Sequence, residues 1–262
     1  DRGLSESAVL VARTLSNDTG SLETDDLVVC EVPVALSFNS VSYAVMMATP
    51  ADLEDFIRGF AIGEGIVSTP SAIYDIEITQ AANGIDVNAS VSNETAYKLK
   101  DRRRSMAGPS GCGLCGIESI EQLRRDVKPV TPDRGDRLVP SEKALNRALV
   151  GLRPLQDVSR KTGGAHAAAW CSADGDILAL REDVGRHNAS DKLLGWRALN
   201  PTEGFVLVSS RASFEMVSKA ATAGVTVLVA VSAPTSAAVD TAKQAGLCPI
   251  AFATDGRSAR YA

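Results

Sequence analysis

Strand-like and helix-like segments alternate toward the end of the sequence. Short apolar runs rich in β-branched residues indicate strands, and longer stretches with an apolar residue every three or four positions indicate helices. The strands fall at 204–208, 225–231 and 248–252, with helices at 213–223 and 235–245 between them. Two βα units in succession predict a parallel sheet with right-handed crossovers, because parallel neighbours need a connection that crosses the sheet.

The segment before this alternation predicts a hairpin and two further helices. Ala165–Cys171 and Ile177–Arg181 flank an Asp-Gly turn, as two antiparallel strands do. One helix is expected from Ser141 to about Leu152 and another from Arg186 to about Leu199. A hairpin joined to parallel strands makes a mixed sheet, so the sheet should be only partly parallel.

The first part of the chain predicts a separate, smaller α+β unit. Residues 27–48 are rich in β-branched residues and are broken at Phe38-Asn39-Ser40, which indicates two strands around a turn. Thr49-Pro50 then predicts a helix start, with Thr49 as the N-cap and Pro50 at the first helical position. Two more strands, Ile73–Thr79 and Ile85–Val91, flank an Asn-Gly turn.

These segments divide the chain into three parts. Residues 1–95 form the small α+β domain, 96–139 hold a basic segment and a mobile loop with two cysteines, and 140–262 form a larger α/β domain. The fold class we expect is therefore α/β, with a partly parallel mixed sheet in the larger domain.

Charge and hydropathy exclude two broad classes of function. The formal net charge is −5 at pH 7, so the chain lacks the broad basic face that duplex nucleic acid requires. The sequence has no apolar run of the roughly 18 residues that span a membrane, and its start lacks the blocks of a secretory signal. We therefore expect a cytoplasmic protein with no nucleic-acid partner and no membrane partner.

Two cysteines, Cys112 and Cys115, stand in a glycine-rich stretch that reads GPSGCGLCG. Such a pair supplies half of a tetrahedral zinc site, or it forms a redox dithiol when it lies between a strand and a helix. The three other cysteines stand singly in strand-like segments: Cys30, Cys171 and Cys248. The chain has only two histidines, and the glycines indicate a mobile loop, so we assign no metal site although both alternatives stay open.

A third interpretation is a nucleophile on a tether. Arg102, Arg103 and Arg104 lie just upstream, and a positive field lowers the pKa of a thiol and so favours the thiolate. A thiolate on a glycine-jointed loop can reach a donor on one side and an acceptor on the other. The same basic run also fits a solvated helix face.

Three loops follow the three predicted parallel strands. The first contains Ser209, Ser210 and Arg211, the second spans 232–235, and the third spans 252–257. The carboxyl ends of parallel strands form the ligand crevice of open α/β sheets, and helix N-termini there favour phosphate oxygens. Ordinary N-capping explains Thr235 equally well. It does not explain Arg211, because a cation at a helix N-terminus opposes the helix dipole unless an anion is nearby.

Asp183, His187 and Asp191 are spaced four apart, which predicts one helix face, with Asp183 placed just before the helix where it can cap the helix start. An aspartate beside a histidine can fix its tautomer, so His187 is either a cofactor contact or part of a network at the helix start. His166 lies among small residues, where a hydrogen-bonded core histidine is the ordinary interpretation.

Five motifs, in order, resemble the FdhD family of formate dehydrogenase accessory sulfurtransferases. They are EVPVAL at 31–36, GCGLCG at 111–116, GAHAAAW at 164–170, EDVGRHNASDKLLG at 182–195 and VLVSSRASFEMV at 206–217. The resemblance implies that a cysteine desulfurase loads a persulfide and that its sulfur passes to the molybdenum bis-guanine-dinucleotide cofactor of formate dehydrogenase. It also implies that Cys112 carries the persulfide, that Cys115 belongs to the same catalytic motif, and that the protein is a homodimer.

The C-terminus resembles the family's cofactor-binding segment F-x-x-x-G-R. The match covers Phe252, Ala253, Thr254, Asp255, Gly256 and Arg257. Phe252 can stack on a purine, Gly256 lets backbone approach a phosphate, and Arg257 can pair with it. The chain departs from the family by having Thr254 where a basic residue is common and by adding Asp255. On this resemblance, GDP should bind to the segment as a mimic, because it corresponds to half of the cofactor's guanine dinucleotide.

The resemblance also implies that the larger domain shares the fold of cytidine deaminases. Deamination is excluded, because those enzymes need His-x-Glu and the third position of the motif that begins at His166 is Ala168. A protein that only binds and shields the molybdenum cofactor, without carrying sulfur, is the main alternative. A zinc-clipped interaction module is the third.

Overall fold

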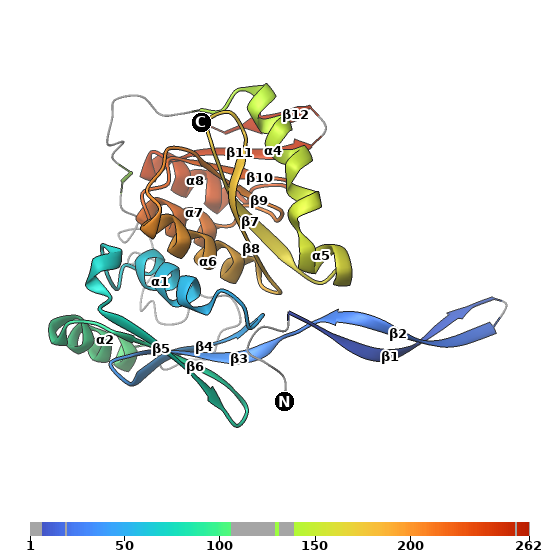
Figure 1. Ribbon diagram of the computed structural model, residues 1–262. Helices are drawn as coiled ribbons and strands as arrows, with labels where there is room; N and C mark the ends of the chain where they lie inside the picture. Colours follow the sequence, from blue (N-terminus) through green and yellow to red (C-terminus); the bar gives the residue numbers. More distant parts are fainter. Residues whose placement is uncertain (1–6, 19, 106–128, 131–138, 255, 262) are drawn as a thin grey trace.

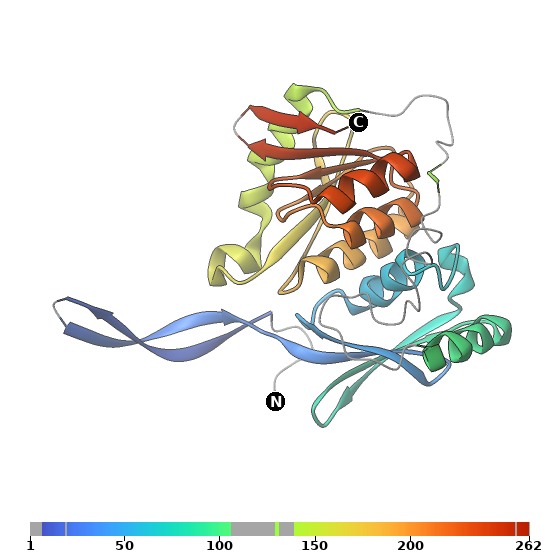
Figure 2. The ribbon, with the colours of Figure 1, turned by 180° about the vertical axis from the view of Figure 1, so that it is seen from behind.

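The computed structural model describes residues 7–18, 20–105, 129–130, 139–254 and 256–261, and it contains three β-sheets (Figure 1). A six-stranded mixed sheet with helices on both faces forms the larger body. A four-stranded sheet lies beneath it, and a two-stranded ribbon extends from the four-stranded sheet (Figures 1 and 2). None of the helices in the described ranges is long and apolar enough to span a membrane.

The four-stranded sheet has the order β4-β3-β6-β5. Its elements are β3 (Val32–Phe38), β4 (Val41–Ala48), α1 (Leu53–Gly63), the 3-10 turn η1 (Pro70–Ala72), β5 (Asp75–Ala81), β6 (Gly84–Ser90) and α2 (Asn93–Ser105). The central pair β3 and β6 is parallel, and the outer pairs are antiparallel hairpins. Phe56, Ile57 and Phe60 of α1 are buried against Val34 and Leu36 of β3 in one core. The strands predicted between 32 and 91 are confirmed.

The six-stranded sheet has the order β12-β11-β10-β9-β7-β8. Its strands are β7 (His166–Cys171), β8 (Ile177–Asp183), β9 (Phe205–Val208), β10 (Val227–Ala230), β11 (Cys248–Thr254) and β12 (Arg257–Arg260). The helices are α4 (Glu142–Leu155), α5 (Asp157–Thr162), α6 (Arg186–Leu199), α7 (Phe214–Thr222) and α8 (Ser236–Ala245). Strands β9, β10 and β11 are parallel and the other pairs are antiparallel, which confirms the partly parallel sheet and the α/β class.

Helix α6 joins the two larger sheets, because it packs on the six-stranded sheet and crosses α1. Both helices carry a glycine at the crossing. A methyl group on Gly59 would overlap the backbone of Asp191, and one on Gly195 would overlap the backbone of Asp55. Only glycine therefore permits this backbone approach.

The two-stranded ribbon consists of β1 (Ala8–Asn17) and β2 (Gly20–Val29), paired in antiparallel fashion along their whole length. It extends away from both larger sheets (Figures 1 and 2). We call it the arm. Sequence patterns give strand signals only from Leu27 onward, so the arm is a feature that sequence reasoning missed.

The prediction that a helix starts at Thr49 is wrong. Helix α1 begins at Leu53, and Asp52 precedes it in the left-handed region with φ 53° and no side-chain cap. The Thr49 side chain instead accepts a hydrogen bond from Val184 N at 3.2 Å, and Thr49 N donates to Asp183 Oδ2 at 3.0 Å. Thr49 is fully buried, so its tertiary partners replace the local capping role.

Candidate functional site

The three loops after the parallel strands lie side by side at one edge of the six-stranded sheet. Ser232 N donates to Ser210 O at 3.3 Å, and Phe252 N donates to Ser232 O at 3.2 Å. On the other side, Ser209 N donates to Ala167 O and Ala167 N donates to Ser209 Oγ, both at 2.9 Å. The predicted convergence of these loops is confirmed. We call the group formed by 209–211, 232–235 and 252–257 the sheet-edge site.

Phe252 has the most unusual backbone in this site. Its φ is 53°, a left-handed conformation that is a genuine outlier for a bulky residue. The ladder between β11 and β12 is irregular between Ala251 and Thr254, and 48% of Phe252 is exposed. The neighbours Ala251 and Ala253 are completely buried. The irregular backbone therefore turns the aromatic ring outward while the strand on either side stays in the core.

The remaining residues of the third loop divide into exposed and buried positions. Thr254, Gly256 and Arg257 are exposed, whereas the Ala253 side chain is buried and can offer a ligand only its backbone. Gly256 has φ 76°, which favours glycine, and the turn leads into β12. Asp255 lies outside the described residues.

The first loop presents a cation and turns its second serine inward. Arg211 is exposed, while Ser210 is buried and its Oγ donates to Arg211 O at 3.1 Å. Helix α7 begins directly after this loop with Ser213 as its N-cap, since Ser213 Oγ accepts from Met216 N at 3.4 Å. Thr235 caps α8 in the same way, accepting from Ala238 N at 3.2 Å, so its interpretation as an N-cap is confirmed.

His187, in the first turn of α6, lies between two residues of the α7 start. Its Nε2 is 3.3 Å from Ser213 Oγ, and its Nδ1 is 3.6 Å from Glu215 Oε2. Burial, together with the charges of Arg186 and Lys219, lowers the pKa of His187 to about 4. The imidazole is therefore neutral at pH 7, so it acts as a hydrogen-bonding group rather than a cation. Burial and Arg186 also lower the pKa of His166, which begins β7.

Behind His187, Lys219 of α7 is buried among three carboxylates. Its Nζ lies 2.8 Å from Asp191 Oδ2, 3.1 Å from Glu64 Oε1 and 3.5 Å from Glu215 Oε1. Burial alone would lower the pKa of Lys219, but the three carboxylates raise it above its ordinary value, so the ammonium stays protonated. Two buried oxygens of this group, Asp191 Oδ1 and Glu215 Oε2, have no hydrogen-bond partner among the described residues.

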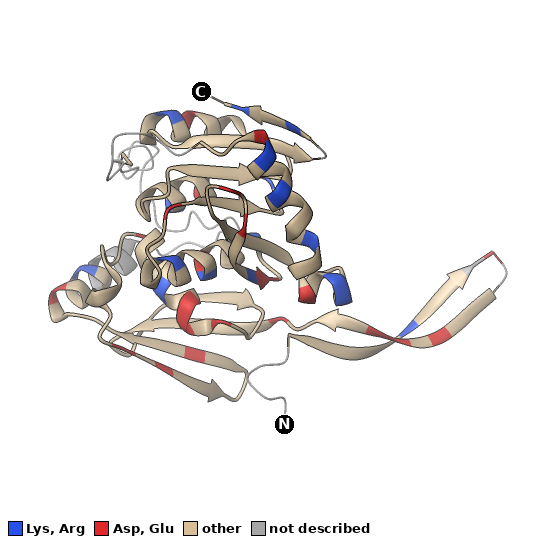
Figure 3. Ribbon diagram, turned by 45° about the horizontal axis from the view of Figure 1, so that its top comes forward, with Lys and Arg blue, Asp and Glu red and all other residues tan. Residues whose placement is uncertain are grey.

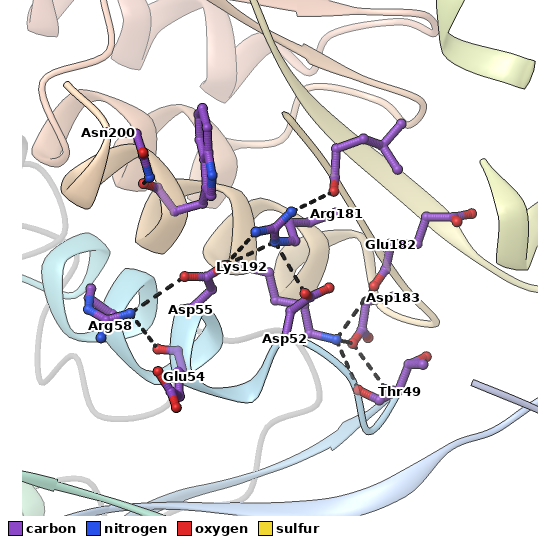
Figure 4. A network of polar contacts seen from close by, with 12 residues as sticks. Thr49, Asp52, Glu54, Asp55, Arg58, Arg181, Glu182, Asp183, Lys192 and Asn200 are labelled. Carbon is purple, nitrogen blue, oxygen red and sulfur yellow. Dashed lines mark hydrogen bonds and ion pairs between the residues drawn. The ribbon is translucent and has the colours of Figure 1, made fainter. Parts of the chain in front are cut away.

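A second buried lysine, Lys192 of α6, points toward Asp183 and Thr49 (Figure 4). Its Nζ is 2.7 Å from Asp183 Oδ2 and donates to Thr49 O at 2.9 Å. Asp183 Oδ1 accepts from Gly185 N at 2.8 Å and from Asn188 Nδ2 at 2.9 Å. Asp183 lies just before α6 and accepts from Gly185 N at its start, as the helix-start alternative predicted. The expected shared face is wrong, because Asp183 faces Lys192 whereas Asp191 faces Lys219.

Arg181 ties β8 to α1 beside this lysine (Figure 4). Its Nε and Nη2 donate to Asp55 Oδ2 at 3.0 and 2.7 Å. Sequence reasoning missed Arg181, Lys192, Lys219, Glu64 and Glu215. Asp55 lies 126 positions from Arg181, and Thr49, whose carbonyl accepts from Lys192, lies 143 positions from that lysine. Only Glu215 and Lys219, four apart on α7, gave a local signal.

The predicted roles of Cys112 and Cys115 stay predictions, because both cysteines lie outside the described residues. The same holds for the effect of the upstream arginines, since the side chains of Arg102–Arg104 also lie outside them. The other three cysteines are free and buried: Cys30, Cys171 and Cys248. Burial raises the pKa of the Cys171 thiol to about 12, so it stays protonated. Within the described ranges, no group of three or more potential ligands could hold a metal ion.

Fold and site together define a mixed α/β protein with a polar strand-end site beside a neutral histidine. The FdhD/NarQ family model matches residues 29–262, and the chain belongs to that family. The "Sulfur carrier protein FdhD" of Cupriavidus necator is 50% identical over 240 residues, covering 90% of this chain and 82% of the relative. That of Bordetella petrii is 46% identical over 256 residues, covering 96% and 90%.

A solved structure supports the fold. The crystal structure of a candidate formate dehydrogenase accessory protein from Desulfotalea psychrophila superposes with a TM-score of 0.76. The match covers 98% of this chain and 97% of that chain, at 22% identity.

Proposed function

We propose that this protein is a sulfurtransferase that carries sulfur as a persulfide on Cys112. A cysteine desulfurase supplies the sulfur, and the acceptor is the molybdenum bis-guanine-dinucleotide cofactor of the formate dehydrogenase catalytic subunit. The relatives named sulfur carrier proteins, at 46% and 50% identity, support sulfur transfer. A cytoplasmic location fits thiols that must stay reduced.

The loading step is a thiol exchange. The Cys112 thiolate attacks the outer sulfur of the donor's persulfide, a new sulfur–sulfur bond forms on Cys112, and the donor cysteine leaves as its thiolate. The chain's other thiols support this assignment indirectly. Cys30, Cys171 and Cys248 are buried, which leaves Cys112 and Cys115 as the candidates for exchange. The Cys115→Ala variant decides whether Cys115 takes part.

Phe252 carries the binding part of the proposal. A bulky residue held at φ 53° with its ring exposed needs a reason, and strained residues cluster at ligand sites. A purine stacked on the ring supplies that reason. The exposed guanidinium groups of Arg211 and Arg257 suit the phosphates of a guanine dinucleotide, and the N-termini of α7 and α8 face the same edge. Neutral His187 and the Ser213 hydroxyl add hydrogen-bonding groups beside Arg211.

Isothermal calorimetry with GDP tests the nucleotide site. GDP should bind and ADP should bind more weakly. Arg257→Ala should weaken GDP binding by roughly 10- to 100-fold, the size of a lost charge-assisted hydrogen bond. Arg260→Ala is the matched control, because Arg260 is also exposed on β12 but stands at the far end of the strand. Absence of GDP binding, or equal binding by Arg257→Ala, would place the nucleotide elsewhere. GDP binding without sulfur on Cys112 would favour the cofactor-shielding alternative.

A further inference from the structure

Arg186, the first residue of α6, has no partner for its charge. Its Nε is buried without a hydrogen-bond partner, and no hydrogen bond or ion pair joins its guanidinium to another described residue. The first turn of α6 contains no acidic residue, and its N-cap, Gly185, has no side chain to offer. A cation at a helix N-terminus opposes the helix dipole. A partly buried arginine in this position needs an anion that the described residues do not provide.

Two imidazoles lie beside this guanidinium, those of His166 and His187. Burial is the first cause that lowers the pKa of each imidazole, and the charge of Arg186 is the second. The His166 side chain is partly buried and has no hydrogen-bond partner among the described residues. It is therefore not the hydrogen-bonded core histidine that the sequence suggested. A neutral imidazole of this kind has one N–H group to donate to a ligand.

The sheet register places these three residues at the same edge as the sheet-edge site. His166 begins β7 and pairs with Asp183, the last residue of β8. Strand β7 is antiparallel to β9, so its first residue lies where β9 ends and Ser209 follows. Arg186 and His187 come directly after the end of β8, at the start of α6. We call Arg186, His166 and His187 the Arg186 group.

The strand order separates the Arg186 group from Phe252. Strands β11, β10, β9, β7 and β8 follow one another across the sheet, and neighbouring strands are about 4.8 Å apart. Phe252 belongs to β11 and Arg186 follows β8, so four strand spacings, roughly 19 Å, lie between them along the edge. A ligand whose purine stacks on Phe252 would therefore extend past the loops after β10 and β9 before it reaches the Arg186 group.

The carboxylates near the Arg186 group are already paired with lysines. Asp183 Oδ2 is 2.7 Å from Lys192 Nζ, and Glu215, whose Oε2 is 3.6 Å from His187 Nδ1, has its Oε1 3.5 Å from Lys219 Nζ. Basic and acidic residues are interspersed over the helices of the larger body, so the positive charge is not spread over one broad face (Figure 3). The unpaired charge at this edge is therefore a local feature of the Arg186 group.

We propose that the Arg186 group binds a tetrahedral oxyanion. The guanidinium supplies the charge and N–H donors that suit the oxygens of such an anion. His166 and the pair of His187 and Ser213 supply further hydrogen-bonding groups. The oxyanion is either the diphosphate of the nucleotide or an anionic part of the same ligand beyond it. The link to the molybdenum cofactor rests on the proposed function, whereas the binding of an oxyanion does not.

Nitrogen NMR during a titration with sulfate, a tetrahedral dianion, tests the group at constant ionic strength. Sulfate should raise the pKa of both imidazoles by roughly 1 or more, because an opposite charge nearby favours the imidazolium. Arg186→Gln should weaken sulfate binding by roughly 10- to 100-fold, the size of a lost charge-assisted hydrogen bond. Arg160→Gln is the matched control, because Arg160 is exposed and pairs with Asp157. Unshifted imidazoles, unchanged binding by Arg186→Gln, or equal weakening in both variants would overturn the proposal.

Saturating GDP distinguishes the two sources of the oxyanion. Sulfate that still binds beside GDP would assign the Arg186 group to an anion beyond the nucleotide. Sulfate displaced by GDP, with GDP binding also weakened by Arg186→Gln, would assign the group to the diphosphate. A protein that binds sulfate as expected but not GDP would contradict the nucleotide site and leave the oxyanion site standing. A protein that binds GDP but not sulfate would overturn the oxyanion site alone.

Discussion

The two buried lysines, Lys192 of α6 and Lys219 of α7, are neutralised in different ways. Lys192 meets one carboxylate and the backbone carbonyl of Thr49, and both Asp183 oxygens are hydrogen-bonded. Lys219 contacts three carboxylates, two of whose oxygens have no hydrogen-bond partner among the described residues. A fully satisfied buried pair holds two segments in place. A cluster with surplus acceptors responds to protons and neighbouring ligands, and this one lies directly behind His187.

Lys192→Met should have the largest effect on stability. The substitution leaves Asp183 buried without its cation and should lower the free energy of unfolding by about 3–5 kcal/mol. Urea unfolding measures the loss. Lys98→Met is the control, because Lys98 is 72% exposed and should change stability by less than about 0.5 kcal/mol. A loss below about 1 kcal/mol for Lys192→Met would contradict the structural role of the pair.

Lys219→Met should be milder and should depend on pH. Burial raises the pKa of Asp191 to about 7 even though Lys219 lowers it, so without Lys219 this carboxyl takes up a proton more readily instead of remaining a buried charge. We expect a loss of about 1–3 kcal/mol at pH 8 and less at pH 5. Unfolding at the two pH values checks this. Equal losses at both would mean that the two lysine clusters do not differ in kind.

Asp191→Asn isolates the proton response. A carboxyl whose pKa is raised from 3.8 to about 7 contributes stability below pH 4, and this contribution is lost as the pH rises through 7. The stability of the wild type relative to Asp191→Asn should therefore fall between pH 5 and pH 8, by on the order of 1–2 kcal/mol. A constant difference across this range would show that Asp191 stays ionised throughout.

The titration of His187 should leave the fold intact and appear only in spectra. The chain has two histidines, so His166→Gln assigns both imidazoles in one comparison. Nitrogen NMR should find His187 neutral at pH 7, with a midpoint near 4, because burial and the charges of Arg186 and Lys219 disfavour the imidazolium. A midpoint above 6 would place His187 in a solvated setting instead.

The elements after residue 204 were predictable from local sequence patterns. The alternating segments after residue 204 gave each strand and helix of the parallel sheet, since hydrophobic periodicity reports burial directly. Thr49 shows the limit. Its position before a proline is typical of an N-cap, but a buried partner 134 positions away, Asp183, decides its role. The arm was missed because it has no core within the chain to impose a clear pattern.

The candidate site was predictable to a similar extent. Strand ends identified the three loops, and their contact is confirmed by the hydrogen bonds through Ser210, Ser232 and Phe252. The outward turn of Phe252 was not predictable, because it depends on a backbone irregularity between β11 and β12. The charges behind His187 come from three helices, so no single stretch of sequence reveals them. The contribution of the residues from Cys112 to Cys115 and of Asp255 stays a prediction.

The mass of the tryptic peptide 105–124, which contains both Cys112 and Cys115, tests sulfur carriage most directly. After incubation with a cysteine desulfurase and cysteine, the peptide should gain about 32 Da, the mass of one sulfur atom, and fragmentation should place it on Cys112. Cys112→Ala should lose this gain and the ability to support formate dehydrogenase activity, while Cys115→Ala should keep the gain. A protein that never gains sulfur, or a Cys112→Ala variant that gains it fully, would contradict sulfur transfer through Cys112.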